Sequence, residues 1–144
     1  MAIVQALANT FKDNLMATTA NLEANSLKVA LFDNTATLSA STTAYAIANE
    51  VTGTNYTAGG EAMTGMAVTL DGSTAIFDAD NVSWANATIS AQAAVIYNSS
   101  TITGLTTNAA IAVLDFGEVK TSTNGTFEIQ FPNANASTAL IRIT

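Results

Sequence analysis

The chain has 144 residues, and Ala (28), Thr (23), Asn (14) and Ser (10) account for 75 of them. It contains no cysteine and no histidine, and only 10 % of its residues are charged, against roughly 25 % in an ordinary globular protein. This composition excludes a disulfide scaffold, a Cys/His zinc site and a catalytic centre built on Cys or His. Because 49 % of the residues are hydrophobic, we expect a folded domain with its own core.

The charge balance limits the partners that the protein can have. Acidic residues outnumber basic ones by 11 to 4, which gives a net charge of −7. Four scattered cations cannot form the basic patch that nucleic acids or anionic membranes require, so neither is an expected partner. No basic segment precedes an uninterrupted apolar stretch at the N-terminus, so we expect synthesis in the cytoplasm without a secretory signal.

The N-terminal region has the spacing of an amphipathic helix. Four apolar residues recur every three or four positions: Val4, Leu7, Phe11 and Leu15. Neither Gly nor Pro interrupts residues 1–17, so the pattern predicts a helix there and an N-terminal helical arm over residues 1–25. Two interpretations remain open: the apolar stripe packs on its own domain, or it docks on a neighbouring subunit.

From residue 26 onwards the apolar period becomes two, as in β-strands. Strands are expected at residues 27–31, 66–70, 73–77, 88–98, 109–116, 127–131 and 138–143. Loops rich in Ser, Thr and Asn separate them, at residues 35–49 and 98–108, and Asn124-Gly125 reads as a tight turn. The sequence therefore predicts a mainly β protein, an antiparallel β-sandwich or jelly-roll over residues 26–144.

The clearest local pattern is a β-hairpin around Asp71-Gly72. These two residues separate two apolar strands, as in a type I′ turn. The turn predicts that Leu70 lies opposite Ser73 and Val68 opposite Ala75.

Few side chains suggest chemistry. Asp78 and Asp80 have the spacing of paired carboxylates, but a solvated acidic loop is the simpler interpretation. Trp84, the single tryptophan, falls in an expected loop at residues 78–86, where it would either anchor the loop or stack on a sugar. Arg142 is expected to form a cross-strand ion pair with Glu128. We therefore predict no catalytic residue, no bound metal and no cofactor.

Six short segments carry a family resemblance: residues 56–60 (YTAGG), 83–84 (SW), 95–98 (VIYN), 112–117 (AVLDFG), 125–132 (GTFEIQFP) and 139–143 (ALIRI). In order and spacing, over residues 26–144, the chain resembles a family of small structural proteins of tailed-bacteriophage virions. The resemblance implies a non-enzymatic capsid decoration or cement protein. Its expected partners are the major capsid protein and further copies of itself, as a dimer or trimer, and its expected location is the virion.

Two other functions are weaker alternatives. The first is a tail- or fibre-associated module that binds a receptor or carbohydrate through Trp84. The second is a carbohydrate-active enzyme that uses Asp78 and Asp80.

Overall fold

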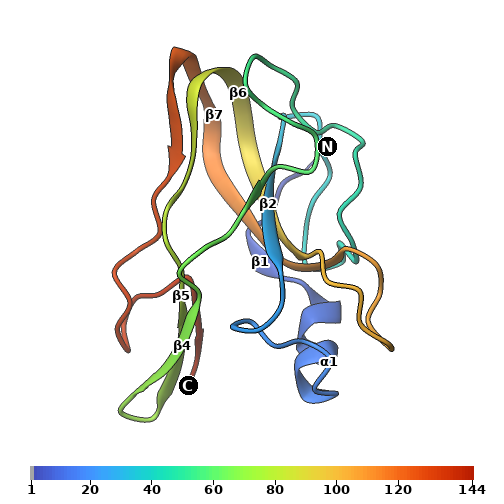
Figure 1. Cartoon of the computed structure of the whole chain (residues 1–144), viewed down its shortest axis with the longest axis vertical. Coiled ribbons are helices and arrows are strands. Elements are labelled where there is room, and N and C mark those ends of the chain that lie inside the picture. Colours follow the sequence, from blue (N-terminus) through green and yellow to red (C-terminus); the bar gives the residue numbers. More distant parts are fainter. Residues whose placement is uncertain (1) are drawn as a thin grey trace.

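The computed structural model describes residues 2–144 and is mainly β, with 46 % strand and 6 % helix (Figure 1). Two antiparallel sheets form a sandwich-like fold with one short N-terminal helix, which confirms the predicted fold class. In chain order the elements are β1 (Ala6–Leu7), α1 (Asn9–Met16), β2 (Leu27–Phe32), β3 (Glu61–Ala62), β4 (Ala67–Asp71), β5 (Thr74–Asp78), β6 (Val82–Asn98), β7 (Ala109–Ile129) and β8 (Ile141–Ile143).

The larger sheet has the strand order β1-β7-β6-β2-β3 and contains most of the core. Residues 109–113 of β7 are buried on both faces, as expected for a central strand, and so is nearly all of β2. Helix α1 contacts β7, and the irregular segment of residues 33–60 contacts β2 through the bond from Val51 N–H to Leu31 C=O and through the antiparallel bridge between Glu50 and Phe32.

The smaller sheet has the order β4-β5-β8. It lies with α1 at one end of the molecule, the lower end in Figure 1, while β6 and β7 extend to the other end. One strand edge of β4 and one of β8 have no neighbouring strand among residues 2–144.

The predicted helix over residues 1–17 is too long. Residue 1 lies outside the described residues, Val4 and Leu7 precede the helix, and Leu7 pairs with Ala112 in the β1–β7 ladder. Phe11 is buried in the core of its own chain, while Leu15 is half-buried. Backbone pairing to β7 thus replaces the first helical turns and divides the predicted stripe between a strand and a helix.

Two predicted loops or turns are parts of long strands. Trp84 lies within β6, and Asn124-Gly125 lies within β7 rather than at a chain reversal. Asn86 and Asn124 both take positive φ where the β6–β7 register shifts. Each is a bulge that interrupts the two-residue alternation, which is why the sequence pattern did not show continuous strands.

The β4–β5 hairpin exists, but its turn lies one residue later than predicted, which moves the partner of each β4 residue by two positions. Asp71 pairs with Thr74, so the turn residues are Gly72 and Ser73. Gly72 has φ +61° and Ser73 is not among the positive-φ residues, as in a type II′ turn rather than type I′. Leu70 therefore lies opposite Ala75, and Val68 opposite Phe77.

The predicted ion pair of Arg142 with Glu128 is also wrong. Strand β8 pairs with β5, not with β7, and Ile76 is the partner of Arg142. The guanidinium donates from Nη1 to the carbonyl of Ala136 at 2.6 Å. The return of the chain to β5 could not be predicted from the order of strands alone.

Candidate interaction site

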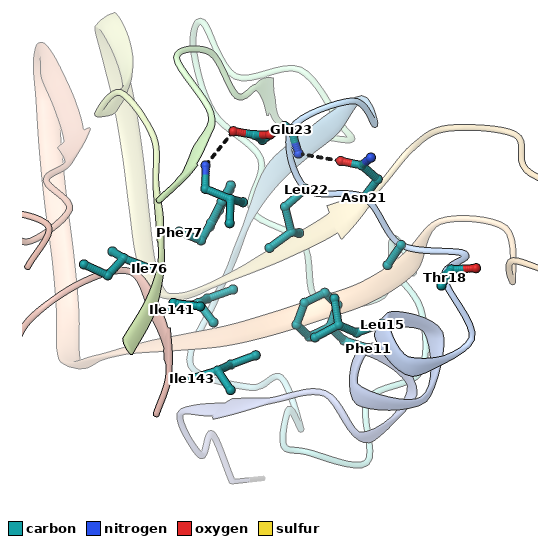
Figure 2. Close-up of a pocket in the computed structure, with 13 residues that line it drawn as sticks. Phe11, Leu15, Thr18, Asn21, Leu22, Glu23, Ile76, Phe77, Ile141 and Ile143 are labelled. Atoms are coloured by element: carbon teal, nitrogen blue, oxygen red, sulfur yellow. Dashed lines mark hydrogen bonds between the residues drawn. The ribbon is translucent and has the colours of Figure 1, made fainter. Parts of the chain in front are cut away.

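An apolar groove lies between α1, the loop that follows it and one face of the smaller sheet (Figure 2). Its volume is about 400 Å³. Phe11 and Leu15 line it from the helix, and Ile141 and Ile143 approach them from β8. The groove therefore lies between two layers, the helix with its following loop on one side and the smaller sheet on the other, whose side chains do not fill the space between them.

The hairpin register places apolar side chains on the groove side of the sheet. Directly paired residues share a face, so Val68, Phe77 and Ile141 form one row across the three strands. Leu70, Ala75 and Ile143 form the next row.

Burial along these rows is uneven. Phe77 and Ile141 are buried, but Leu70 is 72 % exposed, Ile143 49 % and Val68 45 %. Met16, at the end of α1, is also exposed. An apolar surface thus continues from the groove onto solvent-facing strand residues, which in soluble proteins often marks a binding surface.

The loop after α1 is held by its own polar side chains. Asn21 Oδ1 accepts the backbone N–H groups of Glu23 and Ala24, each at 3.1 Å, while Asn25 Oδ1 accepts the N–H of Asn21 at 2.8 Å. Leu22 lines the groove from this loop and is buried. The predicted helical arm over residues 1–25 is therefore wrong beyond Met16, because the asparagine side chains bond to the backbone and fold this stretch as a loop.

Glu23 connects this loop to the sheet. Its Oε1 accepts the backbone N–H of Val68 on β4 at 2.7 Å, as drawn in Figure 2. Glu23 is the one charged residue among those that line the groove. The Glu23 carboxylate therefore accepts a hydrogen bond from one of the backbone N–H groups on the outer edge of β4.

Trp84 does not present a stacking face. It is 2 % exposed, and its ring lies beside Tyr56 and Phe127, with ring centroids 5.9 and 6.1 Å away. Its Nε1 is buried and has no hydrogen-bond partner in the described structure. Trp84 has the position of a core aromatic residue, so the sugar-stacking interpretation is wrong for this structure.

Two tyrosines donate to the buried carboxylate of Glu50, and the third packs beside them. Tyr45 donates to Glu50 Oε2 and Tyr56 to Oε1, both at 2.6 Å, and the N–H of Gly59 donates to Oε1 at 2.7 Å. Tyr97 stacks on Tyr45 at 4.6 Å and donates to the Gly59 carbonyl at 2.7 Å. We call Glu50 with Tyr45, Tyr56 and Tyr97 the Glu50 cluster.

The Glu50 cluster holds the segment of residues 33–60 against the larger sheet. Burial, followed by the hydrogen bond to Glu50, raises the pKa of both Tyr45 and Tyr56 above the ordinary tyrosine range. Burial and the charge of Glu50 also raise the pKa of Tyr97. The carboxylate is buried and both its oxygens already accept hydrogen bonds from Tyr45, Tyr56 and Gly59, which favours a structural role over a catalytic one.

The two carboxylate candidates, Asp78 and Asp80, lie in different local settings. Asp78 ends β5, whereas Asp80 lies beyond the strand and accepts the hydroxyl of Thr64 at 3.0 Å. Within residues 2–144, no group of three or more acidic side chains is arranged to hold a metal ion. In the same residues no helix is long and apolar enough to cross a membrane.

The fold and site thus define a mainly β protein with an apolar groove beside a strand edge that has no neighbouring strand among residues 2–144. No protein-family model, curated protein or solved structure matches the chain.

Proposed function

We propose that the protein is a non-enzymatic structural component of a bacteriophage virion, a decoration protein that binds the major capsid protein and stabilises the head. The observation that carries the proposal is the apolar groove with the exposed side chains beside it. A protein that acts by covering a surface needs an apolar contact area and no reactive group.

The groove supports this function through its surroundings. The chain is strongly acidic, with a net charge of −7, yet Val68, Leu70 and Ile143 leave apolar surface exposed at one end. Burying such surface contributes about 25 cal/mol per Å², so a contact repeated by the symmetry of a shell becomes strong in total. The resemblance of residues 26–144 to small phage virion proteins supports the same function independently.

Composition analysis of the particle tests the proposal. Quantitative mass spectrometry of purified virions is expected to find this protein in copy numbers close to those of the capsid subunits or capsomers. Heads assembled without it are expected to rupture at lower temperature, and addition of the purified protein should restore them. A few copies confined to the tail, or heads of unchanged stability, would overturn the proposal.

The carbohydrate-binding alternative depended on Trp84, and that side chain is buried between aromatic neighbours. No other observation favours it, so we propose no second function.

A further inference from the structure

The outer edge of β4 is an open template for another strand. Strand β4 is the first strand in the order β4-β5-β8, and its five pairs with β5 run without a register shift. It contains no Pro and no Lys, two residues with which proteins commonly protect an edge. Among the described residues, the hydrogen bond found for the outer backbone groups of β4 is that from the Val68 N–H to Glu23.

We propose that this edge and the adjoining groove bind an extended apolar segment of another protein that carries a lysine or arginine for Glu23. A strand added along β4 would hydrogen-bond to its backbone, and its alternate side chains would lie beside Val68 and Leu70 on the groove side. The exposed side chains of Val68 and Leu70 would then be covered by the added strand.

Glu23 gives the site its charge preference. Its carboxylate is exposed and bonded to the Val68 N–H, a donor that an incoming strand would satisfy with a backbone carbonyl. Docking would release the carboxylate in a partly apolar setting, where it needs a cation. A lysine or arginine on the incoming segment supplies that cation, while an acidic segment is repelled.

Charge also favours a basic partner at this edge over a second copy of the chain. Each copy has a net charge of −7, with Glu23 at the groove and Asp71 at the hairpin turn. Two copies paired edge to edge along β4 would bring these carboxylates together. The groove therefore fits a basic, apolar partner better than itself.

The inference rests on the proposed function only in taking the partner to be the shell protein. The chemistry of the groove can be tested on the isolated chain, without virions.

The test uses a blocked heptapeptide of alternating valine and threonine with lysine at both ends, and the same peptide with glutamate at both ends. Two-dimensional NMR titration of the full chain follows the backbone amides. The lysine peptide is expected to shift the amides of Val68 and Leu70 and to slow hydrogen exchange at Leu70. The glutamate peptide is expected to bind at least about tenfold more weakly.

Matched variants locate the site. Leu70→Asn, which removes the apolar side chain without adding a charge, is expected to weaken binding of the lysine peptide at least about tenfold. Ile47→Asn, which changes another exposed apolar residue outside the groove, is expected to leave binding unchanged. Glu23→Gln is expected to reduce the difference between the two peptides to about threefold or less, whereas Glu61→Gln should preserve it. NMR spectra of each variant show directly whether it folds.

Three results would overturn the inference: no binding at millimolar peptide, shifts that map away from β4, or a dimer in sedimentation velocity that Leu70→Asn disperses. The last would make a second copy the occupant. If the lysine peptide binds at β4 but virions contain only a few copies, the groove chemistry stands and the proposed function fails.

Discussion

The larger and smaller sheets differ in how completely their apolar faces are covered. In the larger sheet, residues 93–98 of β6 and 109–113 of β7 are buried without exception. In the smaller sheet, Leu70 and Ile143 belong to the apolar face but remain exposed to solvent. These strands of the larger sheet therefore have covered apolar faces, while the smaller sheet has apolar surface available for a partner.

The two sheets are also covered by different means. The larger sheet is rich in alanine at buried positions, among them Ala30, Ala93, Ala94, Ala110 and Ala112. Small side chains let α1 and the segment of residues 33–60 approach the strands closely, and the Glu50 cluster fixes that segment in place. Across the groove, Glu23 makes one exposed hydrogen bond to Val68. We therefore expect the layer that covers the smaller sheet to separate from it more easily than the layers that cover the larger sheet.

The largest expected effect comes from deleting a buried side chain of the larger sheet. Ile96 on β6 is fully buried, so Ile96→Ala should lower the free energy of unfolding by about 4 kcal/mol through lost burial and a cavity. Ile143→Ala on β8 is the matched control, with an expected loss below about 1 kcal/mol. Urea denaturation measures both. Equal losses would mean that the two sheets are equally part of the core.

The next effect concerns the Glu50 cluster. Glu50→Gln keeps the size of the side chain but replaces one carboxylate oxygen, which accepts a tyrosine hydroxyl, with an NH₂ group that can only donate. We expect a loss of about 2 to 3 kcal/mol, because buried donors lose a charged acceptor. Glu61→Gln, on the exposed strand β3, should change stability by less than about 0.5 kcal/mol. A similar small change for Glu50→Gln would contradict the fixing role of the cluster.

A smaller effect should appear at alkaline pH. An unfolded tyrosine loses its proton near pH 10, whereas burial and Glu50 raise the pKa of Tyr56 in the folded chain. The unfolded state therefore releases its proton first, and the free energy of unfolding falls as pH rises above about 10. By pH 11 the contribution of Tyr56 is about 1.4 kcal/mol.

Urea denaturation from pH 9 to pH 11 measures this slope. In Tyr56→Phe the decline should be shallower by that amount, whatever the variant's stability at neutral pH. An unchanged slope would show that Tyr56 titrates alike in the folded and unfolded chains.

Local patterns predicted the fold class and the apolar strands, because alternation over four to six residues determines which face is buried. Glycine at two adjacent positions also permits the turn at residues 56–60, because Gly59 and Gly60 take φ values of +94° and +76°. A side chain at Gly60 would meet the carbonyl of Val29, so glycine permits the close approach that brings Gly59 to Glu50.

The candidate site depended on features that local patterns do not contain. The turn at Gly72-Ser73 differs by one residue from the predicted turn, and that shift decides which residues face Leu70. The pairing of β8 with β5 joins residues more than sixty positions apart, and so does the pairing of Leu7 with Ala112. The groove results from such distant contacts, which one sequence does not specify. The bonds to the Glu50 carboxylate join residues only 5 to 9 positions apart, but their convergence needs the fold of a loop that shows no regular pattern, and Tyr97 reaches the cluster from β6.

The smallest expected effect is the sharpest test of the comparison between the sheets. Leu70→Thr removes a large apolar side chain, yet we expect the free energy of unfolding to change by less than about 0.5 kcal/mol, because Leu70 is 72 % exposed. Threonine also suits a strand, so β4 should form unchanged. Thermal unfolding measures the stability, and a dye that fluoresces on apolar surfaces should bind less. A loss above about 1.5 kcal/mol would mean that Leu70 packs in the core of the isolated chain. Its side chain would then not be available to a partner, and the two sheets would not differ at this position.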